Sequence, residues 1–168
     1  MPQRRELEFA TLAEAAAEVD RLASVETTTT GNFSHGQIVR HLAITLDIVS
    51  GHTPPPKIPF VYRTLGPLIK RFVLKKPIQP GNKLPSDAQS AFWPAGDVSV
   101  VEANKHFHEA LARYEATQQL PPHLIFGKMT KEEQDILQRG HIAMHLGFVH
   151  PTHPTQPTQP TQPTNSDQ

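Results

Sequence analysis

Apolar residues recur at helical spacing in four segments of the chain, and residues that favour helix starts and ends lie beside these segments. Apolar side chains at positions i, i+3, i+4 and i+7 share one face of a helix. Thr11 and Thr130 are each followed three residues later by a glutamate, the capping-box pattern of a helix N-terminus. Ser34 and Gly51 are suited to begin and end the second segment. The pattern predicts four long helices, at about 11–24, 34–51, 97–119 and 131–149.

The chain between the second and third of these helices is rich in proline and glycine. Residues 60–76 predict a short helix or two helical turns, broken near Gly66-Pro67, and residues 77–96 are expected to be irregular. A loop this long usually covers something, and Phe92 and Trp93 are expected to anchor it to the core. No segment alternates apolar and polar residues as a strand would. The expected fold class is all-α, a four-helix bundle with a long, partly helical insertion between the second and third long helices.

The C-terminal segment 151–168 repeats Pro-Thr-Gln and has no large apolar side chain. Such a segment cannot bury enough surface to offset the entropy lost on ordering. We therefore expect a helical-bundle domain at 1–150 and a disordered tail at 151–168.

Charge and composition narrow the classes of partner. Lys plus Arg and Asp plus Glu each number 16, so bulk charge attracts neither nucleic acid nor an anionic membrane. No secretory signal and no apolar run of about 20 residues is present, so the expected localisation is cytoplasmic. Residues 57–76 are locally basic; we interpret them as an amphipathic cover of the domain, with a membrane- or ligand-facing patch as the alternative. The expected partner is an unidentified small-molecule substrate, and a homodimer is left open.

Two histidines in the fourth expected helix suggest a site. His141 and His145 are four residues apart on the same apolar stripe as Leu137, Met144 and Phe148. Two imidazoles at this spacing share a helix face and can bind one metal ion. The spacing alone is weak evidence in a chain with ten histidines. The predicted burial adds to it, because buried imidazoles cost free energy unless their nitrogens find partners.

A metal site needs a third protein ligand, and cysteine is absent from the chain. His35, His41 and His52 lie on or beside the second expected helix, and helical periodicity does not choose between them. His41 is the best held of the three, because full helical turns flank it on both sides.

Two stretches, GNFSHGQIVRHLA and HLIFGKMTKEEQDILQRGHIAMHL, resemble the DinB-like superfamily of metal-binding four-helix bundles, and more narrowly an uncharacterised bacterial branch of it. The resemblance covers about residues 5–149. The usual ligands of the superfamily are one histidine from the second helix and two from the fourth, which implies His41, His141 and His145 here. Gln134 stands where the branch usually has Trp, and Met144 where it often has a further His, so the pocket wall is expected to differ.

The resemblance also implies a chemistry. Characterised superfamily members include transferases and isomerases that use low-molecular-weight thiols, which the metal is taken to hold as thiolates. The expected cofactors are therefore a divalent metal (Zn, Ni or Fe, which nitrogen donors suit alike) and, as a candidate, a low-molecular-weight thiol. The expected function is metal binding, with a thiol-dependent S-transferase or a hydrolase as candidate activities and no catalytic residue assigned. The alternatives are a non-catalytic metal-binding protein and a purely structural or interaction bundle.

Overall fold

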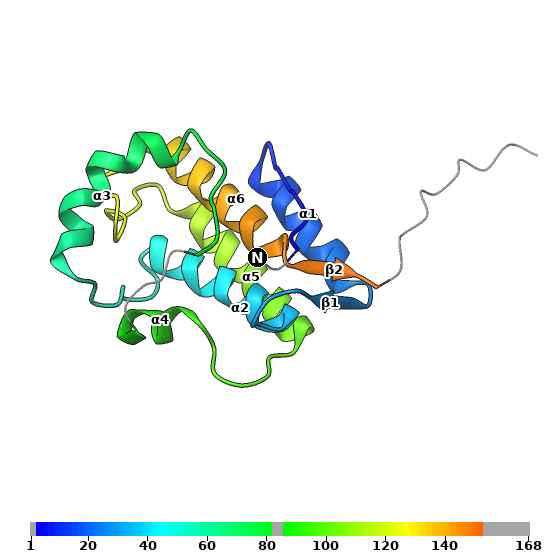
Figure 1. Ribbon diagram of the computed structural model, residues 1–168. Helices are drawn as coiled ribbons and strands as arrows, with labels where there is room; N and C mark the ends of the chain where they lie inside the picture. Colours follow the sequence, from blue (N-terminus) through cyan, green and yellow to red (C-terminus); the bar gives the residue numbers. More distant parts are fainter. Residues whose placement is uncertain (1–2, 82–85, 153–168) are drawn as a thin grey trace, which may run out of the picture.

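The computed structural model of the chain describes residues 3–81 and 86–152. Within them, two short strands lie beside six helices (Figure 1). The helices are α1 (Leu12–Ala23), α2 (His35–Val49), α3 (Phe60–Val73), α4 (Ser86–Phe92), α5 (Val100–Ala116) and α6 (Lys131–Leu146). The strands are β1 (Thr27–Thr29) and β2 (Val149–Pro151). The protein is mostly helical, as predicted, and no helix in the described part of the chain is long and apolar enough to cross a membrane.

The starts of the long helices follow from local capping. The Ser34 and Thr130 hydroxyls accept the backbone N–H groups of Gln37 and Glu133, whose side chains accept the N–H groups of the caps. Gly51, just beyond α2, has φ +79°. The helices α1, α2, α5 and α6 are thus the four long helices predicted from the hydrophobic pattern.

The core lies where these four helices meet. α2 packs along α5, α1 contacts both α5 and α6, and α2 also contacts α6. Large core residues come from each of them: Val19, Leu22, Leu42, Phe107, Tyr114, Ile142 and Leu146. Because α2 and α6 are neighbours, side chains from the two helices can meet at one site.

Three expectations about the connections were wrong. α3 runs without a break through Pro67. The neighbouring Gly66 packs directly on the Ile125 carbonyl: a Cβ at Gly66 would lie 2.7 Å from that carbonyl carbon. The segment expected to be irregular contains α4. The expected absence of strands fails because β1 and β2 pair antiparallel over three residues each, too few for a pattern of alternation to show.

The residues beside the predicted domain boundary at 150 are held by β1. Pro151 pairs with Thr27, and the Thr152 N–H donates to the Glu26 carbonyl at 3.0 Å. The rest of the segment predicted to be a disordered tail, 153–168, lies outside the described residues.

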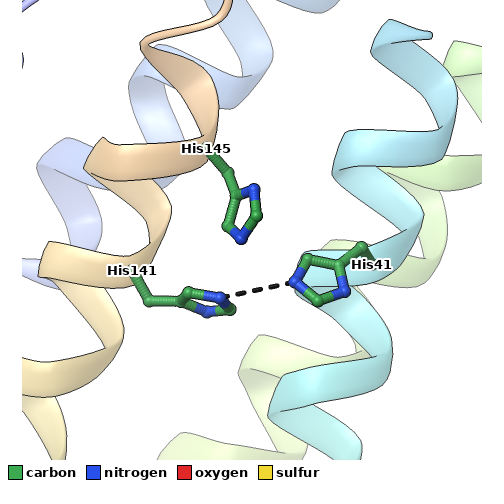
Figure 2. Close-up of side chains that lie close together, drawn as sticks. All are labelled: His41, His141 and His145. Carbon is green, nitrogen blue, oxygen red and sulfur yellow. Dashed lines mark hydrogen bonds between the residues drawn. The ribbon is translucent and has the colours of Figure 1, made fainter. Parts of the chain in front are cut away.

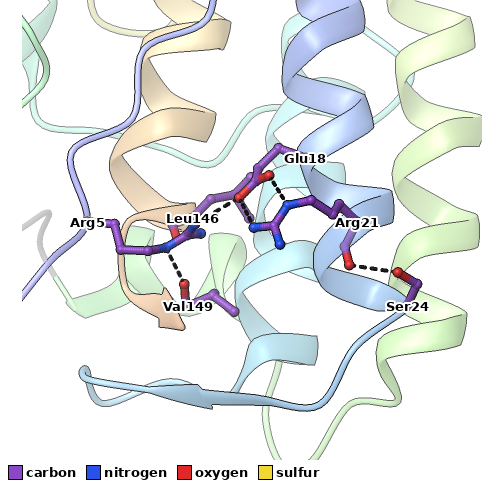
Figure 3. Close-up of polar contacts among 6 residues, drawn as sticks. All are labelled: Arg5, Glu18, Arg21, Ser24, Leu146 and Val149. Atoms are coloured by element: carbon purple, nitrogen blue, oxygen red, sulfur yellow. Dashed lines mark hydrogen bonds and ion pairs between the residues drawn. The ribbon is translucent and has the colours of Figure 1, made fainter. Parts of the chain in front are cut away.

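Arg5, in the segment before α1, connects the end of α6 to α1 (Figure 3). Its guanidinium donates to the carbonyl oxygens of Leu146 (3.2 Å) and Val149 (2.8 Å) and to the Glu18 carboxylate (3.0 Å). Arg21 donates to the same carboxylate at 2.7 Å. Burial raises the pKa of Glu18, but the hydrogen bonds from Arg21 and Arg5 outweigh it, so the pKa lies below its ordinary value. Glu18 is therefore ionised and paired at neutral pH.

We expect Arg5→Ala to lower the free energy of unfolding by about 2 kcal/mol, because it removes charge-assisted hydrogen bonds and leaves the carbonyls of Leu146, at the end of α6, and Val149, in β2, without this donor. Urea unfolding followed by circular dichroism measures the change. Arg5→Lys is the matched control. It keeps the charge beside Glu18 but lacks the planar fork, so an intermediate loss is expected. A loss below about 0.5 kcal/mol for Arg5→Ala would show that these contacts do not stabilise the fold.

Candidate metal centre

Three histidine rings point toward one another across the gap between α2 and α6 (Figure 2). His41 comes from α2, and His141 and His145 are one turn apart on α6. One ligand nitrogen from each lies within 4.8 Å of the others, and the Nε2 atoms of His41 and His141 are 3.3 Å apart. Tetrahedral Zn–N bonds of about 2.0–2.1 Å place neighbouring nitrogens about 3.3–3.4 Å apart. The three histidines therefore lie close enough to bind one metal ion.

The proton on His41 is placed by a backbone carbonyl. Nδ1 of His41 lies 2.9 Å from the Phe92 oxygen, which can only accept, so Nδ1 carries the hydrogen and Nε2 has a free lone pair. Nε2 is the atom that faces His141. Metal-binding histidines typically donate their second ring nitrogen in this way, which fixes the tautomer and the ring orientation. The last residue of α4 therefore orients the His41 ring, with Nε2 toward the other two histidines.

The residues around Phe92 also hold the His41 ring in place. Trp93 stacks on His41 with ring centroids 4.1 Å apart and planes 3° from parallel. Phe33 in turn stacks on Trp93, with ring centroids 3.5 Å apart. Phe92 is buried and Trp93 packs against the core, which confirms that these two residues anchor the long connection. The connection thus serves to position a site residue.

The three imidazoles are uncharged at neutral pH. Burial lowers the pKa of His41 to about 4, although the Phe92 carbonyl opposes the shift. Burial, together with the neighbouring histidines, lowers the pKa of His141 to about 3 and that of His145 well below its ordinary value. A metal binds neutral imidazole, so these shifts keep the ligands available down to acidic pH.

These shifts predict that the metal-free protein loses stability as pH falls. The folded-state pKa values lie below the unfolded value of about 6.5, so between them the unfolded chain binds more protons. The contribution of these neutral histidines to the free energy of unfolding is fully present above pH 6.5 and is lost as the pH falls below that value. We expect a loss on the order of 3 kcal/mol between pH 6.5 and 5, above the range where carboxylates titrate.

Urea unfolding in EDTA at several pH values measures this loss. His41→Ala should make the profile less steep, because one histidine with a lowered pKa is lost, whereas His108→Ala, which removes an exposed histidine paired with Asp20 (2.7 Å), should not. A wild-type profile that is flat from pH 6.5 to 5 would contradict the buried, neutral state.

A cavity of about 750 Å³ borders all three histidines. Its walls are mostly apolar, and their polar groups include Arg4, Thr45, Gln138 and His123. None of the described residues that line it is an Asp or a Glu. A volume in this range suits a small organic molecule. The three histidines therefore face a space that can hold an apolar ligand.

His123 is a site residue that sequence reasoning missed. Its Nδ1 accepts the backbone N–H groups of Ile125 (3.1 Å) and Phe126 (3.2 Å), so the ring hydrogen is on Nε2. The ring stacks on Phe126, and burial lowers the pKa of His123 to about 4. The sequence contains a local indication of this arrangement, a glycine four residues after the histidine. The chain reverses at Gly127 (φ +67°), which brings the N–H groups of Ile125 and Phe126 back to His123. His123 is thus a neutral, rigid N–H donor in the cavity wall.

The structure separates the three histidines that periodicity left open as third ligands. His35 lies at the start of α2, where its Nδ1 is 3.0 Å from the Thr27 hydroxyl. His52 is exposed beyond the end of α2. Only His41 among the three belongs to the cluster with His141 and His145.

The expectation that His141 and His145 lie in the buried stripe of their helix needs correction. The buried face of α6 carries Ile142, Ala143 and Leu146, while the two histidines are partly exposed and line the cavity. The cavity between α2 and α6 is the reason, because the histidine face of α6 meets this space instead of packed side chains.

The fold and the cluster define the class of molecule: a helical protein in which three neutral histidines could hold a metal ion beside an apolar cavity. The chain matches the model of a family described as "Protein of unknown function (DUF1569)" over residues 1–152. It belongs to this family. No curated protein and no solved structure matches it.

Proposed function

We propose that the protein binds one divalent metal ion through His41, His141 and His145, and that the ion acts on a small molecule bound in the adjoining cavity. The observation that carries this proposal is the hydrogen bond from Nδ1 of His41 to the Phe92 carbonyl, which leaves Nε2 free to face His141. A metal would bind His41 through this Nε2, which otherwise hydrogen-bonds to Nε2 of His141 at 3.3 Å. Zn, Ni and Fe all suit three nitrogen donors.

The finer description of the fold belongs to the same proposal. α1, α2, α5 and α6 form a four-helix bundle, with α3 and α4 inserted between its second and third helices, of the DinB-like type. The contacts α2–α5, α1–α6, α1–α5 and α2–α6 support it. The ligand set supports it as well, since one ligand comes from the second long helix and two from the fourth.

The proposed reaction is a thiol-dependent S-transfer to an apolar substrate. Three neutral ligands leave the charge of a divalent ion intact, so the ion would favour the deprotonated form of a bound thiol or water. A thiol (pKa about 8.5) needs a much smaller lowering of its pKa to ionise at neutral pH than water does (pKa about 15.7). The absence of Asp and Glu from the described cavity lining favours the thiol, because no carboxylate is placed there to activate a water.

The chain's own residues bind and orient the substrate in this proposal. The apolar cavity walls exclude water from the site. The Nε2–H of His123 is held as a hydrogen-bond donor, because Nδ1 accepts from Ile125 and Phe126. We assign it the role of donating to a polar group of the substrate.

Metal binding at this cluster should be visible in the intrinsic fluorescence of the protein. The chain has one tryptophan, Trp93, and it stacks on His41 at 4.1 Å. We expect stoichiometric Co(II) or Ni(II) to quench its emission strongly, and His141→Ala to abolish the quenching at the same metal concentration. Stoichiometric binding with unchanged Trp93 emission would place the metal elsewhere.

The thiol is tested on the cobalt-loaded protein. Titration with cysteine, glutathione or 2-mercaptoethanol should produce a sulfur-to-cobalt charge-transfer absorption in the near ultraviolet, and their alcohol analogues should not. No absorption change with any thiol would refute the thiol part of the proposal while leaving metal binding intact.

A metal-binding protein without turnover is the second candidate function. The same absence of Asp and Glu from the described cavity lining favours it, because no obvious acid–base group adjoins the histidines. A cobalt spectrum that responds to neither thiols nor apolar ligands would favour this candidate over the enzyme.

A further inference from the structure

The helix α3 presents a continuous apolar surface to solvent. Its large apolar side chains are strongly exposed: Leu68 is 78% exposed, Phe60 77% and Phe72 62%. Val61, Leu65 and Ile69 are each more than half exposed. Of the eight large apolar side chains that are exposed in the described chain, these six lie on one helix, so they form a patch and are not scattered.

The exposed apolar residues lie on one side of α3. At about 100° per residue, Val61, Leu65, Leu68, Ile69 and Phe72 fall within about 100° of arc. The side that faces the domain carries Gly66, which packs on the Ile125 carbonyl. Lys70 joins the helix to the domain through Glu133 at 2.8 Å. α3 is therefore amphipathic with its apolar side turned outward, the reverse of a helix that covers a core.

The segment that carries this apolar surface has only positive charges, and Glu133 of α6 pairs with one of them, Lys70. The sequence has no Asp or Glu between Asp47 and Asp87, and it has seven cations there: Lys57, Arg63, Lys70, Arg71, Lys75, Lys76 and Lys83. Arg63, Arg71 and Lys75 are exposed, and the Lys76 ammonium lies 4.3 Å from the centre of the Phe72 ring. Because the whole chain has no net charge, this segment is a cationic region on a molecule that is otherwise acidic.

The position of α3 leaves this surface accessible. Figure 1 shows α3 at the end of the molecule opposite the β1–β2 sheet. Ile78, just after the helix, and Ile125, beneath Gly66, both line the cavity beside the histidines. The helix α3 itself would therefore lie between the cavity and a surface that received its apolar side.

We propose that α3 docks the protein on the surface of an anionic lipid bilayer, with Leu68 and Phe72 inserted among the acyl chains and Arg71 and Lys75 at the headgroups. Amphipathic helices with exposed Leu and Phe and flanking Lys and Arg bind such interfaces, and the cations add attraction to anionic lipid. The expectation of no membrane contact rested on the zero net charge of the chain and on charges that surround the apolar residues of this segment on several sides. In the structure, Leu65, Leu68, Ile69 and Phe72 are instead exposed together on one side of α3.

The combination of positive charge and apolar side chains favours an anionic bilayer over a second copy of the chain or a nucleic acid. In a second copy paired through the same helix, like charges from the two segments would face each other. A nucleic acid would be attracted by the cations but would leave the aliphatic strip of Leu65, Leu68 and Ile69 without an apolar partner. An anionic bilayer satisfies both the cationic and the apolar groups.

The test is vesicle flotation of the full chain, which requires neither metal nor substrate and is therefore independent of the proposed function. Vesicles of phosphatidylcholine are compared with vesicles that also contain phosphatidylserine. We expect co-flotation with the anionic vesicles at least about tenfold above that with neutral ones, decreasing as salt rises.

Two double variants separate the two parts of the surface. Leu68→Ser with Phe72→Ser removes apolar groups, and Arg71→Glu with Lys75→Glu reverses charges; each should lower binding at least about tenfold. The matched controls are on α5: Val101→Ser, at a side chain 76% exposed, and Lys105→Glu, at an exposed lysine. Both controls should bind as the wild type does.

Several outcomes would overturn the proposal. These are equal binding to neutral and anionic vesicles, equal loss in the controls, or no vesicle binding at all. Concentration-dependent self-association that Leu68→Ser with Phe72→Ser abolishes, without vesicle binding, would instead assign the surface to a second copy. Binding of a DNA or RNA duplex in place of vesicles would assign it to nucleic acid.

Discussion

Replacing His41, His141 or His145 by alanine is expected to lower the affinity for a divalent metal ion at least about 100-fold, because two remaining imidazoles make a poor site. The wild type should carry one equivalent of metal when it is purified without a histidine tag. Inductively coupled plasma mass spectrometry and competition with a chromophoric chelator measure content and affinity. All three variants should lose metal together, since the proposed site takes its ligands from both α2 and α6.

The controls for this experiment are histidines outside the cluster. His108→Ala removes an exposed side chain, and His123→Ala removes a cavity residue that is not one of the three ligands; both should keep full metal content. His35→Ala tests the other buried histidine of α2. Metal that survives the loss of His41 but not that of His35 would refute the assigned third ligand. A wild type that takes up no Zn, Ni or Fe would show that the three histidines are only a polar cluster beside the cavity.

Gly36→Ala is expected to lower the free energy of unfolding by about 3 kcal/mol, in spite of the usual preference of helices for alanine. Gly36 is in the first turn of α2, where a Cβ would overlap the Val98 carbonyl and lie 2.8 Å from its carbon. The Val98 carbonyl belongs to the backbone and directly precedes Ser99, the N-cap of α5, so it cannot rotate away as a side chain could. The starts of α2 and α5 would have to separate along the most extensive helix contact of the fold.

Gly140→Ala on α6 is the matched control. Its Cβ would meet only the Ile78 side chain, at 3.4 Å, which is ordinary contact. This variant should be neutral, or more stable by up to about 1 kcal/mol through helix propensity. Guanidinium unfolding of both variants measures the difference. If Gly36→Ala were as stable as Gly140→Ala, the close approach of α2 to the Val98 carbonyl would be wrong.

Local order along the chain determined the long helices and two of the three histidines of the candidate site. A helix closes its hydrogen bonds over four residues, so the caps at Ser34 and Thr130 and the apolar periodicity were enough to locate helix boundaries closely. The same geometry placed His141 and His145 on one face before any tertiary contact was known. The choice of His41 in the sequence came from a resemblance and from its central place in the helix, and periodicity could not supply it.

Only the tertiary structure determined the third histidine of the cluster and the exposed side of α3, because both depend on contacts between residues that are distant in the sequence. His41 is selected by α6, 100 residues away, and oriented by the Phe92 carbonyl, 51 residues away. The pattern could identify the apolar and basic residues of α3, but not which side would be covered. That was settled by one close contact, between Gly66 and the Ile125 carbonyl. Such contacts depend on how the connections fold back on the helices, and no rule that acts over a few neighbouring residues contains that information.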